Sequence, residues 1–251
     1  MCRYRATLAY DGSAYQGFQR QIEGRPSIQR AVEVAITAVT GQEIAIIGAG
    51  RTDTGVHARG QVIAFDVTWK HGDEALLRAI NANLPADIAL QDITQQPGFH
   101  PRFDAVSRVY QYYIVQANQR QPLLRHYVWQ VRHPLDATEM QKAADLLIGE
   151  HDFAAFGTPP KGNNTVRTVL VSRWTRQSEV YGIRFIYRIE ANAFLYRMVR
   201  RIVGMLVTVG QGKLTVDQFE AAFRGAELIQ AAMIAPPQGL VLEAVRYPED
   251  A

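Results

Sequence analysis

Residues 44–67 read IAIIGAGRTDTGVHARGQVIAFDV, and the fold of the first part of the chain depends on this stretch. Two apolar runs, Ile44–Ile47 and Val62–Val67, predict strands, and the glycine-bounded residues Gly48–Gly60 between them predict a loop. Asp53 lies in this loop with a glycine on either side, and glycines let the backbone approach a ligand closely. The sequence therefore predicts a carboxylate presented by a loop at the end of an apolar strand.

Arg51 lies two residues before Asp53, and in a loop this spacing lets a guanidinium keep the carboxylate ionised and oriented. An ionised aspartate in a dry pocket is a candidate nucleophile or general base. The alternative is an Asx turn, in which Asp53 accepts hydrogen bonds from backbone amides while Arg51 faces water. The Asp-Thr-Gly tripeptide also resembles the aspartic protease signature, but that chemistry needs two aspartates that share a proton, and the tripeptide occurs once.

Strand and helix patterns alternate along the rest of the chain. Before residue 105 we expect a strand over Tyr4–Tyr10, a helix capped by Ser27 and ended by Gly41, and a helix over Asp73–Asn83. Later elements are a strand over Arg108–Gln116, a helix from Asp136, a hairpin of Thr165–Arg176 and Ile183–Ala191, a helix from about Phe194 to Gly210, a helix capped by Thr215 and Gln218, and a strand over Leu240–Tyr247.

This order of elements predicts the fold class. Strands joined by turns and helices, without regular βαβ spacing, are typical of α+β proteins with antiparallel sheets. We expect two domains, residues 1–105 and 106–251, which pack closely because no linker separates them.

Composition limits the classes of function. A chain of 251 residues with 47% apolar residues and a net charge of +3 has a large core and is not disordered. It contains no run of 18 apolar residues and its N-terminus has no secretory core, so we expect a cytoplasmic protein with no membrane partner. Cys2 is the only cysteine and the six histidines lack ligand spacing, so neither a disulfide nor a metal site is expected.

Positive charge is concentrated in one block. Residues 161–213 contain ten Lys or Arg and two Asp or Glu, and 23 of the 27 basic residues of the chain are arginines. Arginine matches phosphate geometry and stacks on bases, so the block predicts a nucleic-acid partner, with Arg167 and Arg173 as phosphate contacts. Arg197 and Arg201 share a helix face, where like charges need an anion between them. The alternative is a solvated sheet face.

Aromatic residues add to this prediction. Tyr110 and Tyr112 lie on the same face of one predicted strand, and an aromatic ring in such a place can stack on an exposed base. The alternative is that both rings belong to the core, where strand aromatics usually lie.

Several motifs now stand in order along the chain: residues 10–21, 49–58, 81–85, 99–103, 107–112, 192–200 and 235–240. Together they resemble the TruA family of tRNA pseudouridine synthases, and the resemblance extends from near residue 1 to near residue 247. Its most specific run is Arg51-Thr52-Asp53-x-Gly55-Val56-His57-Ala58. Thr54 and Phe18 depart from the residues that the family often has, which are alanine and tryptophan.

The resemblance implies the pseudouridine synthase fold, in which two α/β halves with mainly antiparallel sheets meet at a central active-site cleft. It also implies isomerisation of uridine to pseudouridine at positions 38, 39 and 40 of the tRNA anticodon stem-loop. Asp53 matches the essential aspartate, which attacks C1′ or C6, and Tyr110 matches the tyrosine that stacks on uracil. Arg51 matches the arginine that pairs with the aspartate and helps to extrude the base.

The same resemblance implies that Arg200 and Leu242 line the substrate pocket. Its implied RNA contacts are Phe99, His100, Arg102, Phe103, Asn163, Asn164 and Arg167. A homodimer with tRNA as its partner and without a cofactor is implied as well. The remaining alternative is a non-catalytic RNA-binding module, against which Asp53 counts because a carboxylate near phosphates weakens binding.

Overall fold

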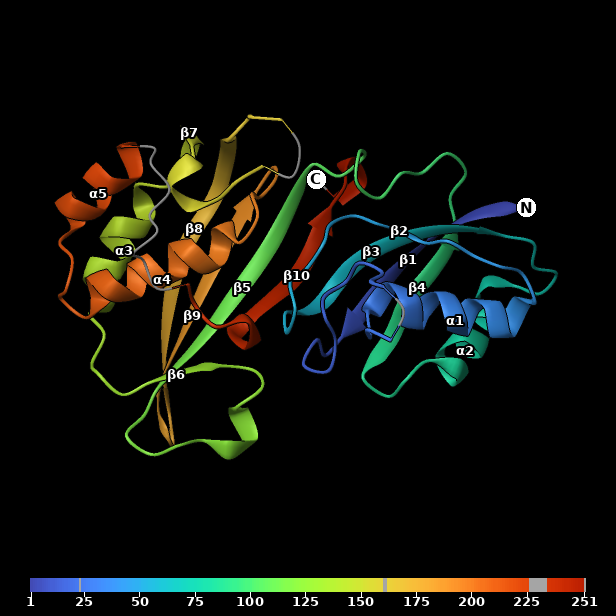
Figure 1. Cartoon of the computed structure of the whole chain (residues 1–251), viewed down its shortest axis with the longest axis horizontal. Coiled ribbons are helices and arrows are strands. Elements are labelled where there is room, and N and C mark those ends of the chain that lie inside the picture. Colours follow the sequence, from blue (N-terminus) through green and yellow to red (C-terminus); the bar gives the residue numbers. More distant parts are fainter. Residues whose placement is uncertain (23, 160–161, 226–233, 251) are drawn as a thin grey trace. The chain divides into compact units, whose positions relative to one another are not determined.

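The computed structural model describes residues 1–22, 24–159, 162–225 and 234–250, and it divides into two compact units (Figure 1). Unit 1 comprises Met1–Val106 with Val241–Ala251, and unit 2 comprises Ser107–Leu240. Each unit has a mainly antiparallel sheet and packed helices, so the predicted α+β class is confirmed. The last strand returns to unit 1, whereas the expected domains were contiguous; the boundary near residue 105 stays a prediction.

In unit 1 the strands lie in the order β4 (Ile88–Gln95), β1 (Cys2–Tyr10), β3 (His57–Val67) and β10 (Leu240–Arg246), and β2 (Ile47–Gly48) pairs with β3. β1 is antiparallel to both of its neighbours, and β10 runs parallel to β3. Helices α1 (Ile28–Thr40) and α2 (Asp73–Asn83) pack together, and α2 also packs on β4 (Figure 1).

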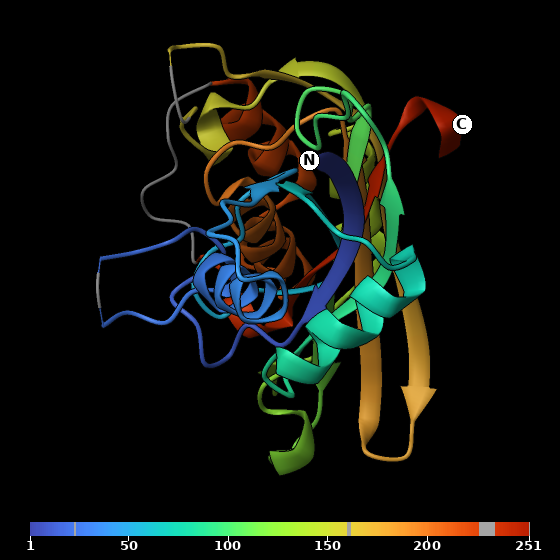
Figure 2. The same cartoon turned by 90° about the vertical axis from the view of Figure 1, so that its right-hand side faces the viewer.

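In unit 2 the strands lie in the order β5 (Ser107–Gln116), β9 (Gly182–Ala191), β8 (Val166–Glu179) and β7 (Gly149–Asp152), and β6 (Trp129–Val131) runs parallel to β5. The helices are α3 (Ala137–Asp145), α4 (Met198–Gly210) and α5 (Val216–Arg224). They pack together, and α3 also packs on β8. Figure 2 shows β8 and β9 as a long hairpin. Short 3₁₀ turns lie at Pro122–Leu124, Ala154–Phe156, Pro237–Gly239 and Pro248–Asp250.

Helix ends follow the local sequence closely. The Ser27 side chain accepts a hydrogen bond from the Arg30 N–H at 3.4 Å, and Gly41 ends α1 with a φ of 67°. Thr215 and Gln218 form both hydrogen bonds of a capping box before α5. Asp136 accepts from two backbone N–H groups at the start of α3. The predicted caps are therefore confirmed.

Other boundaries differ from the prediction. The helix predicted from about Phe194 begins at Met198, because Arg197 has a left-handed φ of 59° that interrupts the helical backbone. The strand predicted over Ile44–Ile47 is reduced to Ile47–Gly48, and β3 begins at His57, five residues before the predicted start. Strands β4, β6 and β7 were not predicted, because their short sequences are polar or lack sustained alternation.

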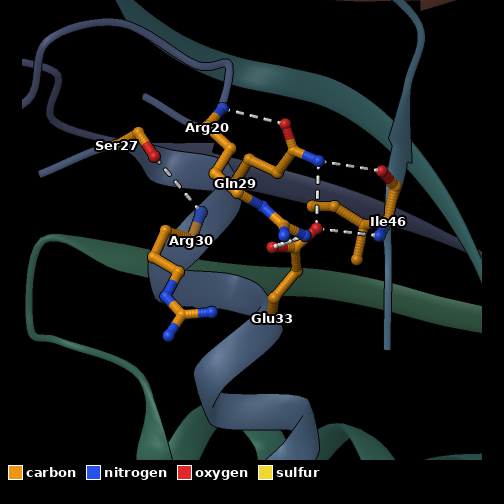
Figure 3. A network of polar contacts seen from close by, with 6 residues as sticks. All are labelled: Arg20, Ser27, Gln29, Arg30, Glu33 and Ile46. Atoms are coloured by element: carbon orange, nitrogen blue, oxygen red, sulfur yellow. Dashed lines mark hydrogen bonds and ion pairs between the residues drawn. The ribbon is translucent and has the colours of Figure 1, made fainter. Parts of the chain in front are cut away.

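A buried carboxylate joins α1 to the segments on either side of it (Figure 3). Glu33 is 2% exposed, and its Oε1 accepts from Gln29 Nε2 at 2.9 Å and from the Ile46 N–H at 3.2 Å. Its Oε2 lies 2.6 Å from Nη2 of Arg20. The Gln29 amide repeats the link, because it accepts from the Arg20 N–H and donates to the Ile46 carbonyl. The helix thus fixes both the segment before it and the chain that leads to the Asp53 loop.

We expect Glu33→Gln to lower the free energy of unfolding by about 1–3 kcal/mol, because the amide cannot pair with Arg20 and sets an NH₂ group against existing donors. Arg30→Gln is the matched control: its side chain is exposed on the same helix, and only its backbone N–H bonds to Ser27. The control should shift stability by less than about 0.5 kcal/mol. Urea unfolding compares the two variants, and equal losses would contradict the role assigned to Glu33.

Candidate active site

The loop that carries Asp53 is tied to unit 1 on several sides. The Gln61 amide donates to the Gly50 carbonyl at 3.0 Å, and the Tyr10 hydroxyl lies 2.8 Å from Thr52 Oγ1. The Val56 N–H donates to the Asp53 carbonyl at 3.1 Å and closes a turn. Gln61, Tyr10 and Thr52 are all buried. Buried hydrogen bonds of this kind hold a loop in one conformation.

Two glycines of the 10–21 motif pack directly against this loop. A Cβ on Gly12 would lie 2.0 Å from the Val56 carbonyl oxygen, and one on Gly17 would lie 2.8 Å from the Thr52 carbonyl oxygen. Gly17 also has a φ of 90°, which disfavours side chains. The Phe18 N–H completes the contact by donating to Thr52 at 3.1 Å. Backbone therefore meets backbone on this side of the Asp53 loop.

His57 holds the same two segments together from the first position of β3. The residue is 4% exposed, and Nδ1 of its ring lies 3.1 Å from the Gly12 backbone nitrogen and 3.1 Å from Asp11 Oδ1. A neutral ring accepts from Gly12, whereas a ring protonated at Nδ1 would pair with Asp11 instead. Both contacts link the start of β3 to the end of β1.

Asp53 is half-buried and Arg51 is exposed. Among the described residues Arg51 forms no ion pair with Asp53, so the predicted pairing stays a prediction. Leu242, predicted to line the pocket, is 1% exposed and pairs in register with Ala58, just beyond the loop. Unit 1 therefore brings Asp53, Arg51 and Leu242 to one end of β3.

In unit 2 the two tyrosines of β5 have different surroundings. Tyr112 is 0% exposed, its hydroxyl donates to the Pro236 carbonyl at 2.7 Å, and burial raises the pKa of this phenol well above its usual value. Tyr110 is half-buried, and its ring meets that of Phe194 edge-on at 5.1 Å. The two rings share one face of the strand, and Tyr110 is the less buried of the two.

Arg200 is also in unit 2, where it holds the segment before β10. Its Nε donates to the Ala235 carbonyl at 2.8 Å, and the Ala235 N–H donates back to the Arg200 carbonyl at 3.0 Å. Ala235 directly precedes Pro236, the acceptor of the Tyr112 hydroxyl. The structure therefore links Arg200 to the strand that carries Tyr110.

The predicted RNA contacts of residues 99–103 are divided by burial. Phe99 is 3% exposed and its ring packs on that of Tyr247 at 5.0 Å, so Phe99 belongs to the core of unit 1 and its contact with RNA stays a prediction. Phe103 is 76% exposed, stacks on His100 at 4.2 Å and lies 5.9 Å from the Arg102 guanidinium. These three side chains form an exposed cluster of ring and charge.

The other predicted RNA contacts lie before β8 in unit 2. Asn163 and Asn164 are exposed, and Asn164 Oδ1 accepts from the Val166 N–H at 2.9 Å. Arg167 donates to the Asn164 carbonyl at 3.1 Å, and burial lowers the pKa of its guanidinium. Arg167 thus holds this loop together.

Sequence reasoning missed the groups beneath the Asp53 loop. Gln61 was assigned neither to the loop nor to the strand, and Tyr10 was read as a strand residue and as the start of the 10–21 motif. A glutamine next to the apolar run Val62–Val67 was the available signal. In the ranges that the structure describes, no helix is long and apolar enough to cross a membrane, and no three His, Cys, Asp or Glu side chains gather as metal ligands do.

The sequence matches that of a known class of enzyme. A family model described as tRNA pseudouridine synthase matches residues 6–104 and 143–248. Curated relatives that match nearly the full chain bear the name tRNA pseudouridine synthase A. The one from Neisseria gonorrhoeae is 40% identical over 98% of this chain and 92% of its own. Those from Methylacidiphilum infernorum and Chloroflexus aurantiacus are 42% and 45% identical, over 98% and 96% of this chain and 96% and 87% of theirs.

A pseudouridine synthase is an RNA-modifying isomerase. This chain belongs to the tRNA pseudouridine synthase family, as its motifs predicted. The alternative of a non-catalytic RNA-binding module is therefore not favoured.

Gly12→Ala tests the packing of the Asp53 loop. The added methyl group would displace the Val56 carbonyl, so we expect kcat/KM on tRNA to fall at least about tenfold and stability to fall by about 1–3 kcal/mol. Gly50→Ala is the control, because a Cβ on Gly50 meets nothing within 4 Å and its φ is not in the left-handed region. The melting temperature of this control, measured by thermal unfolding, should equal that of the wild type. A Gly12→Ala variant with wild-type stability and activity would refute the packing argument.

Proposed function

We propose that this protein converts uridine to pseudouridine at positions 38, 39 and 40 of the tRNA anticodon stem-loop. Support comes from the family and from relatives named tRNA pseudouridine synthase A that match nearly the full chain. The observation that carries the proposal is the position of Asp53 in a loop braced by buried hydrogen bonds. We further propose that the protein acts as a homodimer in the cytoplasm, as the resemblance implies.

The reaction balances without a redox or group-transfer partner. The bond between N1 of uracil and C1′ of ribose breaks, the base rotates, and a bond from C5 to C1′ forms. The proton on C5 is lost and N1 takes up a proton. Asp53 supplies the carboxylate that attacks C1′ of the ribose or C6 of the base. On the first route the bond from Asp53 to C1′ breaks as C5 bonds to C1′, and on the second route the bond from Asp53 to C6 breaks after the C5–C1′ bond has formed. The braced loop keeps this carboxylate oriented while the base turns beside it.

Tyr110 stacks on the uracil and assists removal of the C5 proton in this proposal. Its ring is half-buried, and the Phe194 ring meets it edge-on at 5.1 Å. Stacking of one base on an aromatic ring contributes about 1–3 kcal/mol. That gain offsets the few kcal/mol that extrusion of a base from a helix costs.

The remaining site residues act on the RNA around the target base. Arg51 is exposed, so it can move with the nucleotide, pair with Asp53 and fill the place of the extruded base. Arg200, which donates to Ala235, and Leu242, which pairs in register with Ala58, contact the target nucleotide in this proposal. His100, Arg102, Phe103, Asn163, Asn164 and Arg167 contact the RNA backbone or its bases.

Asp53→Asn should abolish turnover and leave tRNA affinity within about tenfold of the wild type, because the carboxylate performs chemistry and opposes phosphate binding. Tritium release from tRNA labelled at uracil C5 measures turnover, and filter binding measures affinity. Turnover above about a hundredth of the wild type would remove Asp53 from the covalent or base role.

Tyr110→Phe should keep base stacking and lose much of the activity, whereas Tyr110→Ala should lose activity and weaken binding as well. Tyr112→Phe is the matched control on the same strand face. It removes a buried hydrogen bond to Pro236 and should lower stability by about 1–2 kcal/mol with little effect on kcat. Single-turnover rates at 25 °C compare the three variants, and a damaging Tyr112→Phe beside a silent Tyr110→Phe would reverse the assignment.

A further inference from the structure

The sheet of unit 2 divides the basic block of residues 161–213 between its two faces. Tyr110 pairs with Ile189, which pairs with Ser172, so these three residues share one face of the sheet. Arg173 and Arg188 pair with each other one register position away and therefore lie on the opposite face. Arg173, predicted from the sequence as a phosphate contact, thus points away from the face that carries Tyr110.

Three other arginines of the block lie in and just before the first turn of α4, which follows the segment whose Phe194 contacts the Tyr110 ring. Arg200 donates to Ala235, and Arg201 donates to the carbonyls of Phe156 and Tyr196 at 3.5 and 3.4 Å. Arg197 differs from both. It is exposed, and within the described ranges its guanidinium makes neither a hydrogen bond nor an ion pair; it lies only over the Tyr196 ring, 4.8 Å from its centre.

The backbone of Arg197 is unusual as well. Its φ of 59° makes it the one residue other than glycine with a positive φ in the part of the chain that the structure describes. Arginine gains nothing from this conformation, which glycine or asparagine adopts more easily. Backbone strain that a protein retains at one residue is a reason to look for a role of its side chain.

The segment that presents Arg197 is fixed at both ends. The Asn192 carbonyl accepts from the Arg108 guanidinium, its side-chain oxygen accepts from the Thr168 N–H, and its own N–H donates to the Thr168 carbonyl. At the other end, the Tyr196 N–H donates to the Thr158 carbonyl at 3.0 Å. Phe194, between these anchors, contacts the Tyr110 ring at 5.1 Å. Three residues span at most about 11 Å, so the Arg197 backbone stays within that distance of Phe194.

We propose that Arg197, held over the exposed ring of Tyr196, binds a backbone phosphate of the RNA strand close to the target uridine. A guanidinium with no acid beside it, presented from a rigid segment, pairs with a phosphate at little cost in ordering. The Tyr196 ring, 50% exposed, orients the guanidinium. This inference rests on the proposed function and adds a contact residue that the family motifs did not assign.

The test compares Arg197→Asn with Arg173→Asn, which removes the same charge from the same block on the opposite face of the sheet. Equilibrium binding of unmodified tRNA is measured between about 50 and 200 mM salt. For Arg197→Asn we expect Kd to rise about three- to tenfold and the slope of log K against log salt to shrink by about 0.7–0.9. Its melting temperature should be equal to or above that of the wild type, because asparagine accepts the left-handed backbone. Arg173→Asn should leave Kd and slope unchanged.

Two further variants keep the outcome unambiguous. Arg197→Gly should repeat the loss of affinity with no loss of stability, and Tyr196→Phe should bind as the wild type does because the ring remains. An unchanged slope in Arg197→Asn, or a slope that shrinks only in Arg173→Asn, overturns the inference. Pseudouridine formation by the wild type is assayed in parallel: its absence refutes the proposed function, whereas its presence with an unchanged Arg197→Asn slope refutes this contact alone.

Discussion

The close approach of two backbones in unit 1 is the constraint on which the Asp53 loop depends. At Gly12 and Gly17 there is no room for a side chain, because the carbonyls of Val56 and Thr52 occupy the space where a Cβ would stand. Motifs about 40 residues apart in the sequence thereby form one rigid piece. In the mechanism that we propose, the Asp53 carboxylate attacks a carbon while a base rotates beside it, and such rigidity serves this step because small displacements cost large factors in rate. The glycines and the aspartate therefore serve a single purpose.

Polar side chains beneath the loop complete this arrangement at some cost. Gln61 is fully buried, and only its amide nitrogen has a hydrogen-bond partner among the described residues. A well-packed apolar residue at this position would avoid the cost of an unpaired buried oxygen. An apolar residue could not hold the Gly50 carbonyl, however, and the loop would lose its anchor next to Arg51 and Asp53. The unpaired Gln61 oxygen therefore lowers the stability of the interior, while the Gln61 amide nitrogen fixes the loop that carries Asp53.

The sequence predicted the features that depend on local chemistry. Neighbouring residues alone determine the caps at Ser27 and Thr215, the strand alternation over Tyr4–Tyr10 and the motif around Asp53. These features could therefore be predicted from the sequence. Features that depend on distant partners were not. The left-handed Arg197 cannot be read from its own side chain, and the face on which Arg173 lies follows from a register that shifts between Val169 and Val171. Phe99 lies in a motif that was predicted to contact RNA, and its packing against the distant residue Tyr247 shows that it belongs to the core.

The choice between Tyr110 and Tyr112 illustrates how tertiary structure selects a functional residue from equivalent candidates. Alternation gives both rings the same face of β5, so strand geometry alone treats them alike. The segment before β10 distinguishes them. The Pro236 carbonyl accepts a hydrogen bond from the Tyr112 hydroxyl. A Cβ on Gly239 would lie 2.6 Å from the Tyr112 ring, so only glycine at position 239 lets this segment pack on the ring. Arg200 fixes the same segment by donating a hydrogen bond to the Ala235 carbonyl. Because Tyr112 is buried in this way, Tyr110 is the less buried ring of the two, and we propose it as the one that receives the base. The Ala-Pro-Pro-x-Gly motif contributes to this proposal by covering Tyr112.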